Sequence, residues 1–176
     1  MTRSDVVRCW AGFASLGAGL VHFSVVREHL DEWWLFGVFF IGLGTMQVLW
    51  AVATLARDRV PFPRLIVLAT TMTLVLWAVT RTVGLPVGPE PGEAESAGLS
   101  DVVAGVLELV VVLAVLAATR QRPAGEPRRS TPVAVSLLAF GALAVSALTV
   151  PAIASSSAGG HVHTHGLGPR SSAGGP

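Results

Sequence analysis

The sequence has no lysine and no tyrosine, a single cysteine, and few charged residues for its length. Charged side chains make up 13% of its 176 residues, whereas an ordinary soluble domain has roughly 25%. The formal net charge is +1, which lacks the basic excess expected of a nucleic-acid-binding surface. Cys9 on its own forms neither an internal disulfide nor a thiolate metal cluster. These absences exclude a nucleic-acid-binding domain and a disulfide-stabilised one.

The sequence also lacks the short motifs of common enzymes. No phosphate-binding glycine loop, Gly-x-Ser-x-Gly elbow or His-Glu-x-x-His zinc motif is present. The several HxxxH and HxxHH clusters of membrane di-iron enzymes are missing. A bis-histidine haem is disfavoured because the two histidines expected on helices, His22 and His29, fall on the same one. A conventional soluble catalytic domain is therefore excluded.

Long apolar stretches dominate what remains. Hydrophobic residues make up 52% of the chain, and the mean hydropathy is +0.64. A helix needs about 20 apolar residues to cross the hydrocarbon core of a bilayer. The segments that meet this requirement are 9–28, 33–56, 65–86, 101–119 and 132–153. We expect an all-α integral membrane protein, with a five-helix transmembrane bundle over residues 1–154 and a flexible, histidine-containing tail over residues 155–176.

Arginine is distributed unevenly between the loops. Nine arginines lie before the first segment, between the second and third, or between the fourth and fifth, and three lie on the other side. By the positive-inside rule, the N-terminus is cytoplasmic and five crossings place the C-terminus outside. Exclusive use of arginine, with abundant alanine, glycine and valine, is typical of a GC-rich bacterial genome. The predicted location is therefore the bacterial cytoplasmic membrane.

Polar residues inside two of the apolar segments indicate a site. His22 precedes His29 by seven residues, and Glu108 follows Asp101 by seven. Seven residues correspond to nearly two helical turns and about 10 Å of depth, so each pair shares a face. Because neither polar group belongs in lipid, we expect His22 and Glu108 to face one shared pocket at the outer side. Arg81 is expected to border this pocket and to offer Glu108 a charged partner.

These residue types also suit a divalent transition metal. The tail motif His161-Val-His163-Thr-His165 would place three imidazoles on one side of an extended segment, which is typical of short metal-binding tracts. Glu28, Asp31 and Glu32 are expected in a tight outer loop, where they would complete a carboxylate-rich mouth. The predicted metal is zinc or copper. The candidate ligands are His22, His29, Asp101, Glu108, His161, His163 and His165.

Three functions remain open from the sequence. The first is binding of a divalent metal on the outer side, for transport, delivery or sensing. The second is a membrane enzyme with Glu108 as acid/base, His22 as its partner and Arg81 binding an anionic group. The third is a structural subunit of a membrane complex, in which Glu108 and Arg81 form a buried ion pair. Gln47 is expected to form an interhelical hydrogen bond, and Trp77 to belong to the core.

The partners implied are the lipid bilayer and, because five helices form only a modest bundle, a second copy or another membrane protein. Two stretches carry a resemblance. The first runs from Val21-His-Phe through Glu32-Trp-Trp to Gln47-Val-Leu-Trp-Ala51, and the second from Arg81-Thr-Val-Gly-Leu-Pro-Val-Gly-Pro to Glu108. Together they resemble small multi-pass membrane proteins of GC-rich, actinobacterial-type Gram-positive bacteria. The resemblance covers the first four predicted helices and implies no activity.

Overall fold

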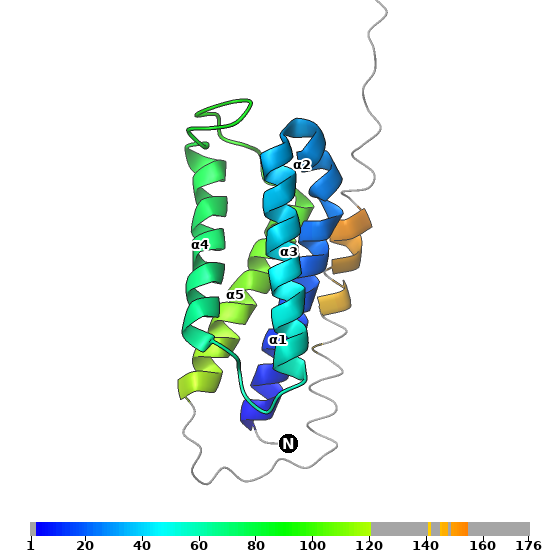
Figure 1. Cartoon of the computed structure of the whole chain (residues 1–176), viewed down its shortest axis with the longest axis vertical. Coiled ribbons are helices and arrows are strands. Elements are labelled where there is room, and N and C mark those ends of the chain that lie inside the picture. The colour runs from blue at the N-terminus through cyan, green and yellow to red at the C-terminus, as the bar shows by residue number, and fades with distance from the viewer. Residues whose placement is uncertain (1–2, 121–140, 142–144, 148, 155–176) are drawn as a thin grey trace, which may run out of the picture.

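The computed structural model describes residues 3–120, 141, 145–147 and 149–154. Among these residues, four helices are long and apolar enough to cross a membrane, and a short helix, α2 (Val26–Glu32), follows the first of them. The four are α1 (Arg3–Ser24), α3 (Trp34–Leu55), α4 (Pro63–Thr82) and α5 (Leu99–Arg120). They correspond to the first four predicted segments. The chain is therefore a small multi-pass helical membrane protein (Figure 1).

The first predicted helix, 9–28, is interrupted at Val25. The Ser24 hydroxyl donates a hydrogen bond to the Val21 carbonyl at 2.7 Å, and such bonds to the preceding turn bend helices. The chain then continues as α2, which folds back towards α3 at an extended Trp33. Glu28, Asp31 and Glu32 therefore lie on a helix, and the prediction of a tight loop for them is wrong.

Helix α1 packs closely against α3 and α5 through small side chains. Ala11, Ala14 and Ala18 are completely buried. A Cβ atom added to Gly19 would lie 3.0 Å from the backbone oxygen of Gly44 on α3, so the two helix backbones approach one another here. This close approach is what the small residues of the first segment predict.

Helix α4 packs against α5, whereas its contact with α3 is at most marginal in the described residues. Figure 1 shows α4 (green) standing apart from α3 (cyan). The helix begins directly after Phe62, a residue in the left-handed conformation, with Pro63 in its first turn. Proline is suited to this position because its missing N–H would have no partner there. Because α4 and α3 have so little contact, a cavity lies between α3, α4 and α5.

The loop between α4 and α5, residues 83–98, is non-helical, as its glycines and prolines predict. It begins earlier than expected, since α4 ends at Thr82 rather than at residue 86. Gly84, Gly88 and Gly92 all have positive φ angles, which glycine adopts without steric cost. The Glu95 amide donates a hydrogen bond to the Thr80 carbonyl at 3.0 Å. This bond holds the end of the loop against the last turn of α4. The loop and α2 lie at the same end of the bundle (Figure 1).

The described residues of the fifth predicted segment are helical and lie beside α1 (Figure 1). A Cβ on Gly141 would be 2.7 Å from the Trp10 ring. At the other end, Ser100 donates a hydrogen bond to the Ala152 carbonyl at 3.0 Å. The other residues of this segment lie outside the described residues, and so does the whole tail with its three histidines.

Candidate functional site

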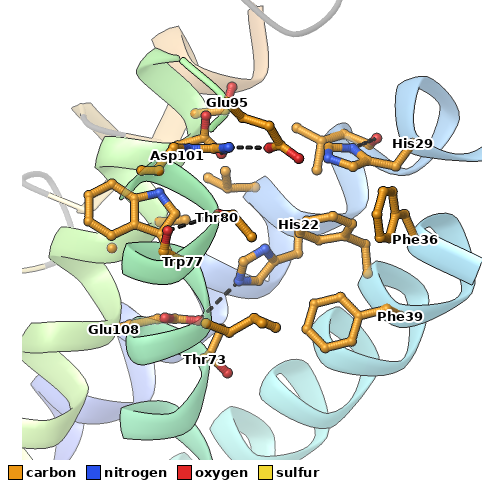
Figure 2. A pocket seen from close by; sticks show the side chains of 18 of the residues that line it. His22, His29, Phe36, Phe39, Thr73, Trp77, Thr80, Glu95, Asp101 and Glu108 are labelled. Atoms are coloured by element: carbon orange, nitrogen blue, oxygen red, sulfur yellow. Dashed lines mark hydrogen bonds and ion pairs between the residues drawn. The ribbon is translucent and has the colours of Figure 1, made fainter. Parts of the chain in front are cut away.

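A cavity of about 250 Å³ opens between α1, α3, α4 and α5, beneath the 83–98 loop. Its walls are mainly apolar and aromatic, with Phe36, Phe39 and Phe40 on α3 facing Leu76 and Trp77 on α4. Polar side chains enter at two levels. One level is deep among the helices and the other is close to the loop, as Figure 2 shows.

The deep level is formed by His22 and Glu108. The Nε2 atom of His22 lies 3.1 Å from Oε1 of Glu108, and both residues are buried, with 6% and 2% of their surface exposed. The depth argument from the sequence predicts this contact, and the structure confirms it. Its origin is the matched seven-residue spacing on α1 and α5, which brings the two groups to one level.

Gln47 completes the deep level, and sequence reasoning missed it as a site residue. Its Nε2 atom donates to the same Glu108 oxygen at 2.9 Å. The predicted interhelical hydrogen bond is therefore present, and its acceptor is the candidate functional carboxylate. The available signal was that Gln47 is the one carboxamide in the uncharged stretch from Trp33 to Ala56. We refer to His22, Gln47 and Glu108 as the deep triad.

The deep triad can hold a proton away from water. An ionised carboxylate only accepts hydrogen bonds, whereas a protonated one also donates. In either case one proton lies between His22 Nε2 and Glu108 Oε1, and the Gln47 amide supplies a second bond to the same oxygen. These bonds offset part of the cost of burying a carboxyl group among apolar side chains. A buried pair of this kind can exchange a proton with a molecule in the cavity.

The shallow level centres on Arg81, whose partners differ from the prediction. Its guanidinium pairs with Asp101 at 2.9 Å and also with Glu95. The predicted ion pair between Arg81 and Glu108 is therefore wrong. The reason is depth, because Arg81 lies in the last turn of α4 and meets the first turn of α5, while Glu108 is two turns further in. The second partner of Arg81, Glu95, comes from the 83–98 loop.

His29 lines the same cavity but is separate from the deep triad. Its Nδ1 atom forms a 2.9 Å hydrogen bond with the Val25 carbonyl. Its ring centroid is 4.2 Å from that of Phe40, which lies 5.6 Å from the His22 ring. Within the part of the chain that the structure describes, no group of three His, Cys, Asp or Glu side chains could hold a metal ion. His161, His163 and His165 lie outside that part, so the metal hypothesis stays a prediction.

Trp77 is a wall of the cavity rather than simply part of the core. Its indole Nε1 atom is buried, and no hydrogen-bond partner for it is present among the described residues. A buried donor without a partner is costly. The indole ring of Trp77 thus contributes an apolar surface to the cavity, while its N–H lies buried. The Nε atom of Arg81 is unpartnered in the same way.

Glu32 lines a second, smaller pocket of about 70 Å³ beside the first. Burial, opposed by the nearby His29 and reinforced by neighbouring carboxylates, raises the pKa of Glu32 above its ordinary value of 4.5. Of the three acids predicted to form a carboxylate-rich mouth, only Glu32 lines this pocket, and Glu90, Glu93 and Glu95 from the 83–98 loop join it there in place of Glu28 and Asp31. None of His22, Gln47 and Glu108 lines this second pocket.

Comparison with known proteins identifies no family for this chain. No protein-family model, no curated protein and no solved structure matches the chain. Function must therefore be argued from the chemistry of the cavity, which is in any case a stronger basis than fold resemblance.

Proposed function

We propose that this protein binds a lipophilic small molecule in the cavity, and that the His22–Glu108 pair receives the polar group of that molecule. The observation that carries the proposal is a buried histidine–carboxylate contact at the base of a mainly apolar cavity. Apolar walls with a few convergent polar groups are the usual composition of small-molecule sites. The apolar walls would contact the body of the ligand, and the deep triad would orient it.

The size of the cavity limits what it accepts. Its volume of about 250 Å³ lies just below the common range for ligand pockets, about 300–1,000 Å³. One compact ring system, or one end of a longer lipid, would occupy it. Binding of the end of a lipid would leave the remainder of that lipid in the bilayer.

A membrane enzyme is the second candidate, because the deep pair could exchange a proton with the bound group. Glu108 would act as acid/base and His22 would hold the proton in turn. Arg81 takes a different part from the one expected from the sequence. Since its guanidinium already pairs with Asp101 and Glu95, it would fix the loop above the cavity rather than bind an anionic substrate.

The metal hypothesis needs a ligand from the tail, and the structural-subunit hypothesis needs another protein of a membrane complex. A zinc or copper site would take His22 and Glu108 as two ligands and would need at least one more, from the tail histidines. A purely structural subunit would use the deep triad as an interhelical connection and leave the cavity to lipid acyl chains. Metal analysis of the purified full chain would separate the metal hypothesis from the rest.

A substitution that fills the cavity tests the proposal. Gly105 lines the cavity, and a Cβ added there would meet only Leu74, at 3.9 Å. Gly105→Phe should therefore occupy the ligand's space with little conflict with the helix backbone. Wild-type protein purified from its own membranes should carry a lipophilic compound in near-stoichiometric amount, and Gly105→Phe should lose most of it. Mass spectrometry of the organic extract measures both.

Gly42→Phe is the matched control, because it places the same side chain on a membrane-spanning helix with nothing within 4 Å of the new Cβ. It should retain the compound. Equal extracts from the two variants and the wild type would contradict the proposal. So would stoichiometric zinc or copper in the wild type together with no enriched lipophile.

We also propose the finer topology, with a fifth span over 132–153, a cytoplasmic N-terminus and an external C-terminus in a bacterial cytoplasmic membrane. The placement of Gly141 near Trp10 and of Ala152 near Ser100 supports a segment that runs alongside α1 in the same direction. A periplasmic-type reporter fused after Pro176 should be active, and a cytoplasmic-type reporter there should be silent. The reverse pattern would place the cavity end of the bundle in the cytoplasm.

A further inference from the structure

The cavity reaches the surface of the protein between α3 and α4. Its lining on these helices includes Phe36 and Phe39 on α3 and Thr73 and Leu76 on α4, and we call these four residues the α3–α4 seam. Phe39 lines the cavity and yet is 42% exposed. Since α3 and α4 have at most marginal contact in the described residues, the seam is not closed by helix packing.

The seam lies at a depth where lipid, rather than water, surrounds the protein. Phe39 is five residues into α3 and Thr73 is nine residues before the end of α4. At 1.5 Å per residue, these positions lie about 8 and 13 Å from the corresponding helix ends. Both helices qualify as membrane spans over these residues. Acyl chains are therefore the expected neighbours of the seam.

The end of the cavity nearest the 83–98 loop is covered, in contrast. Arg81 connects the end of α4 to Asp101 at the start of α5 and to Glu95 in the loop. The loop then reaches α3, where a Cβ on Gly88 would be 3.1 Å from the Phe36 ring. Leu85, also in the loop, contributes an apolar side chain to the lining. A solute from water would have to displace these contacts.

We infer that the ligand is a neutral, membrane-dissolved molecule that enters laterally through the α3–α4 seam. This inference rests on the proposed function and adds the ligand's class and route. An ionised molecule would have to leave its hydration shell to pass four apolar or hydroxyl side chains. A carbonyl or hydroxyl group at the leading end would meet the deep triad, whose His22 and Glu108 line the cavity.

A nitroxide label inside the cavity tests the route. The chain has one cysteine, so Cys9→Ser combined with Gly105→Cys gives a single labelling position on the cavity wall. The labelled full chain is placed in phosphatidylcholine–phosphatidylglycerol vesicles. Collision rates with molecular oxygen, which dissolves in lipid, and with a neutral nickel chelate, which dissolves in water, are then measured by electron paramagnetic resonance. Cys9→Ser combined with Gly42→Cys supplies the lipid-facing reference.

The inference predicts frequent oxygen collisions and few nickel collisions at position 105, close to the pattern at position 42. Adding Thr73→Trp, which places bulk in the seam, should remove most of the oxygen collisions. Adding Met72→Trp on the neighbouring exposed position should not. Frequent nickel collisions would show access from water and overturn the inference, and low rates with both reagents would show a closed cavity and overturn it equally. Neither result would affect the Gly105→Phe extraction, which tests ligand binding itself. Failure of the lateral route is therefore distinguishable from failure of the proposed function.

Discussion

Glu108→Leu is expected to lower the free energy of unfolding by about 1–3 kcal/mol for the polar groups left without a partner. The carboxyl is 2% exposed, shares a hydrogen bond with His22 and accepts one from Gln47. Leucine has a similar size but offers no acceptor, so the imidazole and the amide would both remain buried and unpaired. Unfolding in mixed dodecylmaltoside and sodium dodecyl sulfate micelles would measure the loss.

Glu108→Gln is the matched variant. A glutamine whose carbonyl oxygen takes the place of Oε1 can still accept a hydrogen bond from Gln47, and also one from a neutral His22 that carries its proton on Nε2. It should therefore cost much less stability than leucine, while it removes the carboxyl group that would act as acid/base in the enzyme hypothesis. Loss of ligand turnover with near-normal stability would support the enzyme hypothesis. Equal destabilisation by both variants would contradict the hydrogen-bond account of the deep triad.

Coupling within the deep triad gives an independent check on this prediction. If Gln47 acts through Glu108, the effects of Gln47→Leu and Glu108→Leu should not add, because the first change already removes one of the bonds that the second destroys. Strict additivity would mean that the 2.9 Å contact between these side chains contributes nothing.

Gly84→Ala is expected to release the loop over the cavity. Gly84 has a φ of +73°, and an L-residue in the left-handed region costs about 1–2 kcal/mol. A Cβ there would also lie 2.6 Å from the Glu93 carbonyl carbon and amide nitrogen, which cannot move aside as a flexible side chain can. Hydrogen–deuterium exchange across residues 83–98 should therefore increase sharply in the variant.

Gly92→Ala separates the cost of the positive φ angle from the cost of the steric conflict with neighbouring backbone. Gly92 has a similar φ of +79°, but nothing lies within 4 Å of an added Cβ. This variant should show only the conformational cost and a smaller increase in exchange. If both alanines loosened the loop equally, the close packing of Gly84 against Glu93 would play no part in holding it closed.

The sequence was sufficient for four of the five predicted spans and for the central contact of the site. Hydropathy predicted α1, α3, α4 and α5, and equal depth predicted that His22 and Glu108 meet. Both inferences depend on local spacing and on the high cost of polar groups in lipid, so they need no knowledge of tertiary contacts.

The remaining features depend on contacts that spacing does not reveal. Arg81 pairs with Glu95 because the loop returns to Thr80, and hydropathy carries no information about the path of a loop. The break at Val25 arises from a local bond of Ser24, which competes with helix continuation without changing the apolar pattern. The position of Gln47 in an uncharged stretch indicates that it needs a partner, but only the packing of α3 and α5 on α1 identifies that partner as Glu108.

An experimental structure of the full chain in lipid nanodiscs, prepared from native membranes, would test the central claim most directly. We expect an elongated density in the cavity, continuous with the bilayer between α3 and α4. Its inner end would lie within hydrogen-bonding distance of His22 or Glu108. A compact peak bound by His22, Glu108 and tail imidazoles would contradict it in favour of a metal site. A cavity filled by the protein's own side chains would contradict any ligand at all.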